Sequence, residues 1–88
     1  MFEIKNENTI EIDIDECEMT CAGCPTIFDF VDRKGARYYF RLRHGFAYID
    51  CEDNNETLIS GDMIGFDGVC SWNDIVQWAK NEGVLLNY

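Results

Sequence analysis

The chain has 88 residues, 47% of them hydrophobic and 14% aromatic, and it carries a formal net charge of −10. A chain of this length forms one domain with a modest core, burying about 60–65% of the surface that the unfolded chain exposes. No apolar run approaches the roughly 18 residues of a membrane span. The negative charge repels nucleic-acid phosphates and anionic membranes, so direct binding to either is not expected.

The N-terminal region, MFEIKNENTIEIDID, is acidic and lacks the basic and apolar regions of a signal peptide. We therefore expect a cytoplasmic protein. Residues 2–5 are compatible with a short edge strand. Residues 9–15 predict a clearer strand, because three isoleucines alternate with carboxylates. Paired beside the strand predicted at 36–43, it would set those carboxylates opposite arginines.

Residues 26–52 predict an antiparallel meander of three strands, at 26–32, 36–43 and 46–51. Gly35 suits the first turn, and the His44-Gly45 pair suits a two-residue second turn, because glycine accepts positive φ without strain. In the middle strand an apolar row alternates with a more basic row, and this period of two puts the rows on opposite faces. The apolar row is Ala36, Tyr38, Phe40 and Leu42, and the other is Arg37, Tyr39, Arg41 and Arg43.

The C-terminal third predicts one helix, at residues 71–82. Ser71 and Asp74 form a short version of the capping box, and Gly83 is a suitable left-handed stop. Residues 52–55 read as an acidic turn, 57–66 as irregular or short-strand structure, and 84–86 as a final strand. The sequence thus predicts a single α+β domain over residues 1–88, with a mostly antiparallel sheet of four to five strands and the helix packed on one face.

The cysteines give the predicted loop at 17–25 its chemical character. An odd number of cysteines, five, in a reducing compartment favours metal binding or plain burial over disulfides. The C-x3-C-x2-C spacing resembles the cluster loop of radical SAM enzymes, which are far longer than this chain. Residues 19–24 also resemble the copper-binding loop of heavy-metal-associated domains, in which two thiolates hold a soft monovalent ion.

A third resemblance is to a zinc knuckle at Cys21-x-x-Cys24. Tetrahedral zinc needs four ligands at about 2.0–2.3 Å. The alternative function is therefore a metal-binding module for zinc or a soft metal, held by Cys17, Cys21 and Cys24. Its fourth ligand would be Cys51, Cys70 or His44.

Catalytic machinery is not expected, because the chain has one histidine and its carboxylates alternate with apolar residues on predicted solvent faces. The acids instead form two groups. Residues 1–18 hold seven acids and one lysine, and residues 50–74 hold seven acids and no base. Between the two groups lies a basic island: Arg33, Lys34, Arg37, Arg41 and Arg43.

This distribution predicts a non-enzymatic interaction module, an inhibitor or regulator without a cofactor, which presents acids to a basic site on a partner protein. The basic site of the partner could be one that normally binds nucleic acid, because carboxylates along a strand are spaced about 7 Å apart and form a line of negative charge. In size and charge the chain resembles the small acidic inhibitors that phages and mobile elements make against host nucleases, such as anti-CRISPR proteins. The expected contact residues are Glu11, Asp13, Asp15, Glu16 and Glu18 on one edge and Asp50, Glu52, Asp53 and Glu56 on the other.

Overall fold

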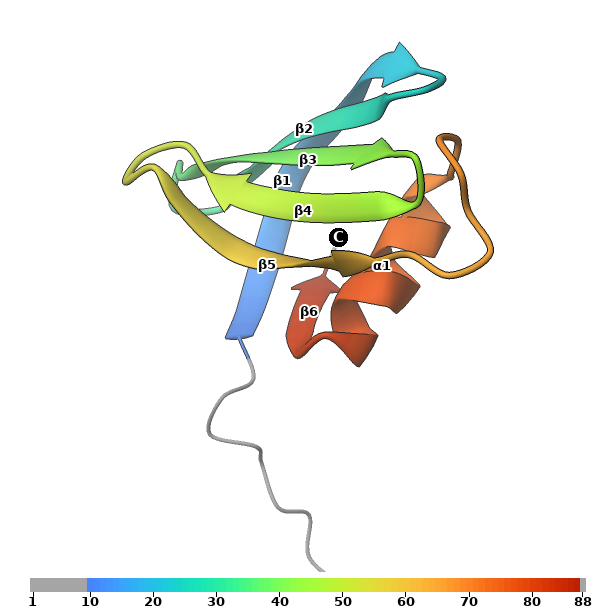
Figure 1. Cartoon of the computed structure of the whole chain (residues 1–88). Helices are drawn as coiled ribbons and strands as arrows, with labels where there is room; N and C mark the ends of the chain where they lie inside the picture. The colour runs from blue at the N-terminus through green and yellow to red at the C-terminus, as the bar shows by residue number, and fades with distance from the viewer. Residues whose placement is uncertain (1–9, 88) are drawn as a thin grey trace, which may run out of the picture.

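The computed structural model describes residues 10–87, so the strand predicted at 2–5 lies outside the described residues. A six-stranded mixed sheet in the order β5-β4-β3-β2-β1-β6 accounts for most of this part of the chain (Figure 1). The expected α+β class is confirmed, with more strands than the four to five predicted. The elements are β1 (Ile10–Ala22), β2 (Thr26–Asp32), β3 (Arg37–Arg43), β4 (Phe46–Cys51), β5 (Glu56–Asp62), α1 (Trp72–Asn81) and β6 (Val84–Asn87).

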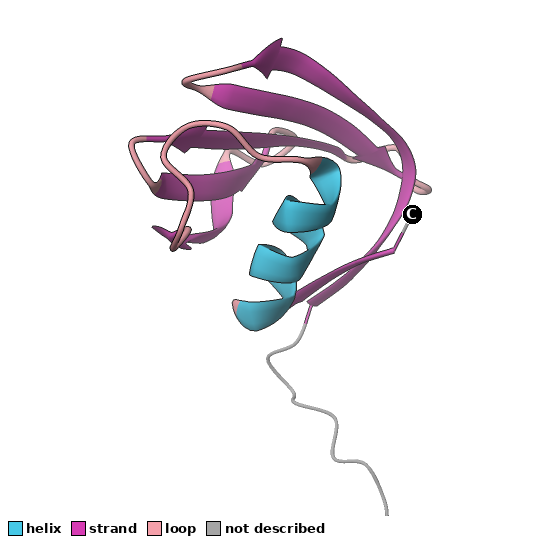
Figure 2. Ribbon diagram, turned by 90° about the vertical axis from the view of Figure 1, so that its right-hand side faces the viewer, coloured by secondary structure: helices cyan, strands magenta, loops and turns pink. Residues whose placement is uncertain are grey.

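The sheet curls around α1, so that it has a concave face toward the helix and a convex face toward solvent (Figure 2). The predicted apolar row of β3 points to the concave side, where Phe40 and Leu42 are fully buried. Phe40 meets the helix through Trp78, with ring centroids 5.9 Å apart. From the opposite end of the helix, Trp72 packs against Phe28 and Phe30 of β2. The helix of ten residues is too short to cross a membrane.

The predicted meander is confirmed as β2, β3 and β4, which pair antiparallel in sequence order. His44 and Gly45, with φ of 53° and 80°, form the two-residue turn. Two positive φ angles are the signature of a type I′ turn, whose twist matches that of the flanking strands. The region predicted as irregular or short-strand contains β5, an edge strand whose pairing with β4 is interrupted between Ile49 and Asp50.

One expectation for the N-terminal half is wrong, because the segment from Cys17 is not a loop: β1 runs on through Ala22. The pairing with the 36–43 strand that would set carboxylates opposite arginines does not occur. The later part of β1 pairs antiparallel with β2, which follows it directly in the chain, and its first residues pair parallel with β6. Neighbouring strands in sequence usually pair, and β2 thereby separates the carboxylates of β1 from the arginines of β3.

The helix ends follow the predicted signals. The Asp74 amide donates to Ser71 Oγ at 3.2 Å, and the Ser71 amide donates to Asp74 Oδ2 at 2.9 Å, which completes a capping box. Gly83 has a φ of 98° and ends the helix. The final strand is confirmed as β6. It lies parallel to β1 because the connection to it crosses over through the helix.

A carboxylate that the sequence did not single out holds the β2–β3 turn. Asp32 Oδ1 accepts from the backbone amides of Lys34 and Ala36, both at 2.9 Å, and Oδ2 accepts from the Tyr38 hydroxyl at 3.0 Å. Burial raises the pKa of Asp32, but the hydrogen bonds from Ala36, Tyr38 and Lys34 outweigh it and leave this pKa below its ordinary value. The ionised form is therefore the one that the folded state favours.

Replacing Asp32 by alanine should lower the free energy of unfolding by about 1–2 kcal/mol at pH 7, because three donors lose their acceptor. The folded pKa is depressed, so the stability that ionised Asp32 contributes is present above the ordinary value of 3.8 and is lost as the pH falls through the folded pKa. Urea unfolding at several pH values checks this. The difference in the free energy of unfolding between the wild-type protein and Asp32→Ala should be constant near neutral pH and become smaller below about pH 4. A difference that grows in acid would contradict the assignment.

Candidate protein-binding surface

The five acids predicted on the first strand lie together on β1. Glu11, Asp13, Asp15, Glu16 and Glu18, here called the acidic ridge, are all exposed. In register, Glu16 lies opposite Val31 and Glu18 opposite Asp29, both on the convex side of β2. Ile12 and Ile14 alternate with the ridge and are buried on the concave side. The ridge is therefore a feature of the convex face.

A β-bulge keeps the ridge on one face. Side chains alternate along a strand, so Glu16 and Glu18 would share the buried face of Ile12 and Ile14 if the alternation were unbroken. The register with β2 shifts between Ile14 and Glu16, which makes Asp15 the extra residue of a bulge. Beyond it Glu16 and Glu18 return to the convex face.

The ridge has an amide, an acid and two cations among its neighbours, and the cations, Arg33 and Lys34 of the β2–β3 turn, line one pocket together with Glu11 and Asp13. Asn87 Nδ2 on β6 donates to Glu11 Oε2 at 2.9 Å and to Asp13 Oδ1 at 3.1 Å, which fixes two carboxylates without neutralising them. At the other end, Glu18 lies directly opposite Asp29. Like charges at directly opposed positions destabilise a sheet, so this pair is not explained by a contribution to folding. Asp29 extends the ridge onto β2. Asp29 is not among the residues predicted from the sequence, because its place beside Glu18 depends on the strand register, which the local pattern does not contain.

The second predicted group lies at a different place. Asp50, Glu52, Asp53 and Glu56 surround the β4–β5 connection, here called the turn acids. Asp50 is half-buried and accepts a hydrogen bond from Thr57 Oγ1 at 2.7 Å, while the other three are exposed. β4 is separated from β1 by β3 and β2 in the sheet order. The two groups are therefore separate surfaces.

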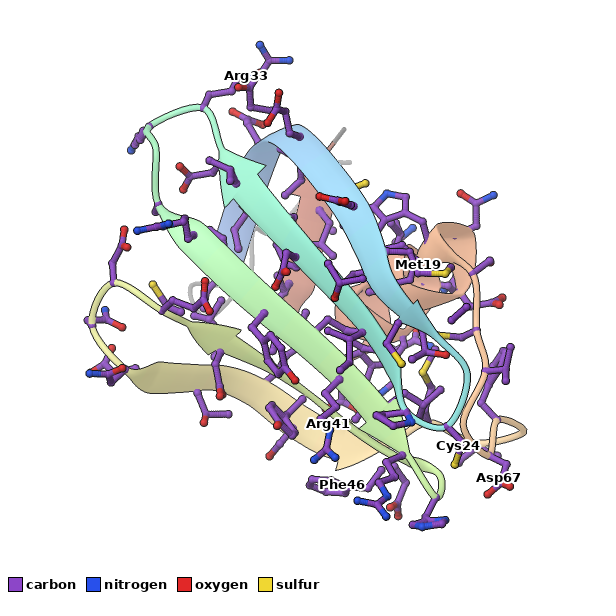
Figure 3. All side chains as sticks on the ribbon, turned by 90° about the horizontal axis from the view of Figure 1, so that it is seen from above. Met19, Cys24, Arg33, Arg41, Phe46 and Asp67 are labelled. Atoms are coloured by element: carbon purple, nitrogen blue, oxygen red, sulfur yellow. The ribbon has the colours of Figure 1, made fainter. Side chains whose placement is uncertain are left out.

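The arginines of β3 occupy the convex face between these groups, and Figure 3 looks onto that face with Arg41 and Phe46 near one end and Arg33 at the other. Arg41 lies opposite Ile27 on one side and Tyr48 on the other. Tyr48 and Tyr39 are neighbours, with centroids 6.2 Å apart. Within residues 10–87, no ion pair joins the ridge to these arginines. The ridge is therefore not neutralised by β3, and the cations beside it are Arg33 and Lys34 near Glu11 and Asp13.

The predicted metal ligands are not gathered by the fold. Cys17 lies opposite Phe30 on the concave side, whereas Cys21 lies opposite Ile27 on the convex side. Cys24, on the loop after β1, packs against Gly68. Among the described residues no group of three or more histidine, cysteine or acidic side chains is placed to hold a metal ion.

The other predicted ligands lie elsewhere. Cys51 and Cys70 are buried, and His44 sits on the β3–β4 turn. Burial raises the pKa of the Cys17 thiol. The pKa of the Cys70 thiol is raised to about 11, mainly by burial and to a smaller extent by the nearby negative charge of Asp74. Raised values oppose formation of the thiolate that a metal or a redox reaction requires.

Searches of protein-family models, curated proteins and solved structures find no match to this chain.

Proposed function

We propose that the chain is a non-enzymatic interaction module whose acidic ridge binds a basic surface of a partner protein, such as the nucleic-acid-binding site of an enzyme. The observation that carries this proposal is the bulge at Asp15, which keeps the carboxylates of β1 on the exposed convex face. From Glu11 to Glu18 the ridge spans about 23 Å at roughly 3.3 Å per residue. A line of negative charge of this length can follow a groove that otherwise holds a nucleic-acid strand.

Two further features support the ridge as a contact surface. The opposed Glu18 and Asp29 carry a cost in folding that binding to a cationic surface would remove. The ridge also lies on a regular strand anchored by the buried Ile12 and Ile14, so its carboxylates are held in place before binding. A preorganised surface loses less conformational entropy on association. Charge complementarity of this kind raises the rate of association and gives specificity.

The test compares two variants that each lose four charges. The ridge variant carries Glu11→Gln, Asp13→Asn, Glu16→Gln and Glu18→Gln, and the turn variant carries Asp50→Asn, Glu52→Gln, Asp53→Asn and Glu56→Gln. Partners captured from the native host by the tagged wild-type protein are identified by mass spectrometry, and their Kd for each variant is then measured. We expect the ridge variant to bind at least tenfold more weakly and the turn variant to stay within about threefold, because truncated central charge pairs cost about 2 kcal/mol or more.

Equal losses in both variants would show that net charge alone drives capture, and a loss confined to the turn variant would place the contact on the other surface. Either result contradicts the proposal. Thermal melts of both variants confirm that the fold is retained. Competition by a single-stranded oligonucleotide then tests the kind of site. The oligonucleotide should displace the chain from the partner if the occupied site normally holds nucleic acid.

A further inference from the structure

A groove of about 430 Å³ runs between the end of β5 and α1, on the helix side of the sheet and away from the acidic ridge. Its volume lies within the range of pockets that hold small molecules or several side chains of a peptide. Its lining combines apolar side chains with carboxylates. The apolar members include Met63, Phe66 and Trp78, and the acidic residues at its rim are Asp62, Asp74 and Glu82.

A hydrogen-bonded turn at residues 63–66 places Ile64 at the edge of this groove. The Phe66 amide donates to the Met63 carbonyl at 3.1 Å, and Gly65 has a φ of 91°. A hydrogen bond across four residues with positive φ at the third is characteristic of a type II turn, whose corners project from the chain. Met63 is only 2% exposed and anchors the turn, whereas Ile64 at the corner is 92% exposed. The turn holds a large apolar side chain in solvent beside an apolar groove.

The loop that carries the turn is fixed to the sheet. The Met63 amide donates to the Gly45 carbonyl at 2.8 Å, and the Gly45 amide donates to the Asp67 carbonyl at 2.6 Å. Further along, Thr26 Oγ1 donates to the Gly68 carbonyl at 2.7 Å. Three hydrogen bonds hold the backbone of this loop against the sheet. Ile64 is therefore exposed on an ordered part of the surface.

Trp78 lines the groove and is only 6% exposed, and its indole Nε1 is buried beneath the groove surface. Glu82 lines the groove and is exposed, with its carboxylate facing Gly61 of β5, whereas the next residue, Asp62, lies opposite Phe46 and so turns toward the convex face. Cationic, partly apolar groups are the chemical complement of such a lining.

We propose that this groove binds a basic segment of a partner protein, in which a leucine-, isoleucine- or phenylalanine-like side chain packs on Ile64 and Phe66 while a neighbouring lysine or arginine reaches Glu82. The ammonium or guanidinium group forms charge-assisted hydrogen bonds with this carboxylate. The apolar side chain covers the projecting Ile64, which a small ion alone would leave exposed. This surface is independent of the ridge, because it lies on the other side of the sheet.

The test selects random 12-residue peptides displayed on phage against the full chain, with counter-selection on a groove variant that carries Ile64→Ser and Glu82→Gln. Both side chains are exposed, so the variant should fold. Asp74 is left intact because it caps the helix. We expect enriched peptides to pair a lysine or arginine with a large apolar residue. Synthetic copies should bind the groove variant at least tenfold more weakly than the wild-type protein.

The ridge variant, which loses more charge than the groove variant, is the matched control and should bind the same peptides within about threefold. In a titration followed by amide NMR signals, the shifts should concentrate at residues 62–66 and 77–82. Failure of any peptide to enrich over the counter-selection, or enrichment of peptides without basic residues, would overturn the proposal. Shifts confined to β1 would also overturn it, while leaving the ridge as the binding surface of the chain.

Discussion

Replacing Phe40 by alanine is expected to lower the free energy of unfolding by about 3–5 kcal/mol, the range found when large aromatic side chains are removed from protein cores. Phe40 is fully buried at the centre of β3. Its ring lies 6.4 Å from Phe28 and 5.9 Å from Trp78, both in edge-to-face arrangements. The substitution thus removes one of the aromatic contacts that join the sheet to the helix. Because a small domain has a total stability of about 5–15 kcal/mol, the loss is a large part of it.

The matched control is Tyr39→Ala on the same strand. Tyr39 is half-buried on the convex face, where its ring contacts Tyr48. A cross-strand aromatic pair on an outer face contributes roughly 0.2–1 kcal/mol. Thermal unfolding should place the midpoint of Phe40→Ala at least about 12 °C below that of the wild-type protein, and that of Tyr39→Ala within about 8 °C of it. Equal shifts would show that the two faces of β3 are not divided into core and surface.

The alternation that separates Phe40 from Tyr39 is local, and for this reason the sequence predicts it. Strand faces, the type I′ turn at His44 and the capping box at Ser71 depend on residues within a few positions of one another. The pairing of β1 is different. Its antiparallel pairing with β2 follows from adjacency in the chain once the strand is known to run through Ala22, but its parallel pairing with β6 depends on distant residues and on the crossover through α1, which leave no trace in the alternating pattern.

The acidic ridge likewise has a part that the local sequence pattern predicts and a part that it does not. A strand period predicts the exposure of Glu11 and Asp13, but the same period carried without interruption would bury Glu16 and Glu18. The run of two adjacent acids at Asp15 and Glu16 is the local sign that the alternation changes phase, and a bulge is the structural means. Asp29, in contrast, joins the ridge only through its register with Glu18, which no local signal contains.

The close contact between Gly68 and Cys24 gives the second large expected effect. A Cβ atom added at Gly68 would lie 2.8 Å from both Cβ and Sγ of Cys24 and 3.0 Å from its Cα. Because one of these atoms is backbone, a change of side-chain rotamer cannot relieve the overlap. Gly68 also accepts the hydrogen bond from the buried Thr26 hydroxyl, which ties the 63–70 loop to β2. Displacing Gly68 would strain this bond as well.

Gly68→Ala should therefore lower the free energy of unfolding by about 1–3 kcal/mol, as overpacking of a close contact does. Gly23→Ala, one residue from Cys24, is the control. Its added Cβ would meet only Val69 Cγ2 at 4.0 Å, and its φ is not in the left-handed region. Removing a glycine at a compatible position restricts the unfolded chain, so this variant should match or exceed wild-type stability by about 0.4–1 kcal/mol. Urea unfolding of both variants decides the matter, since equal effects would mean that the Gly68 contact does not hold the loop against the sheet.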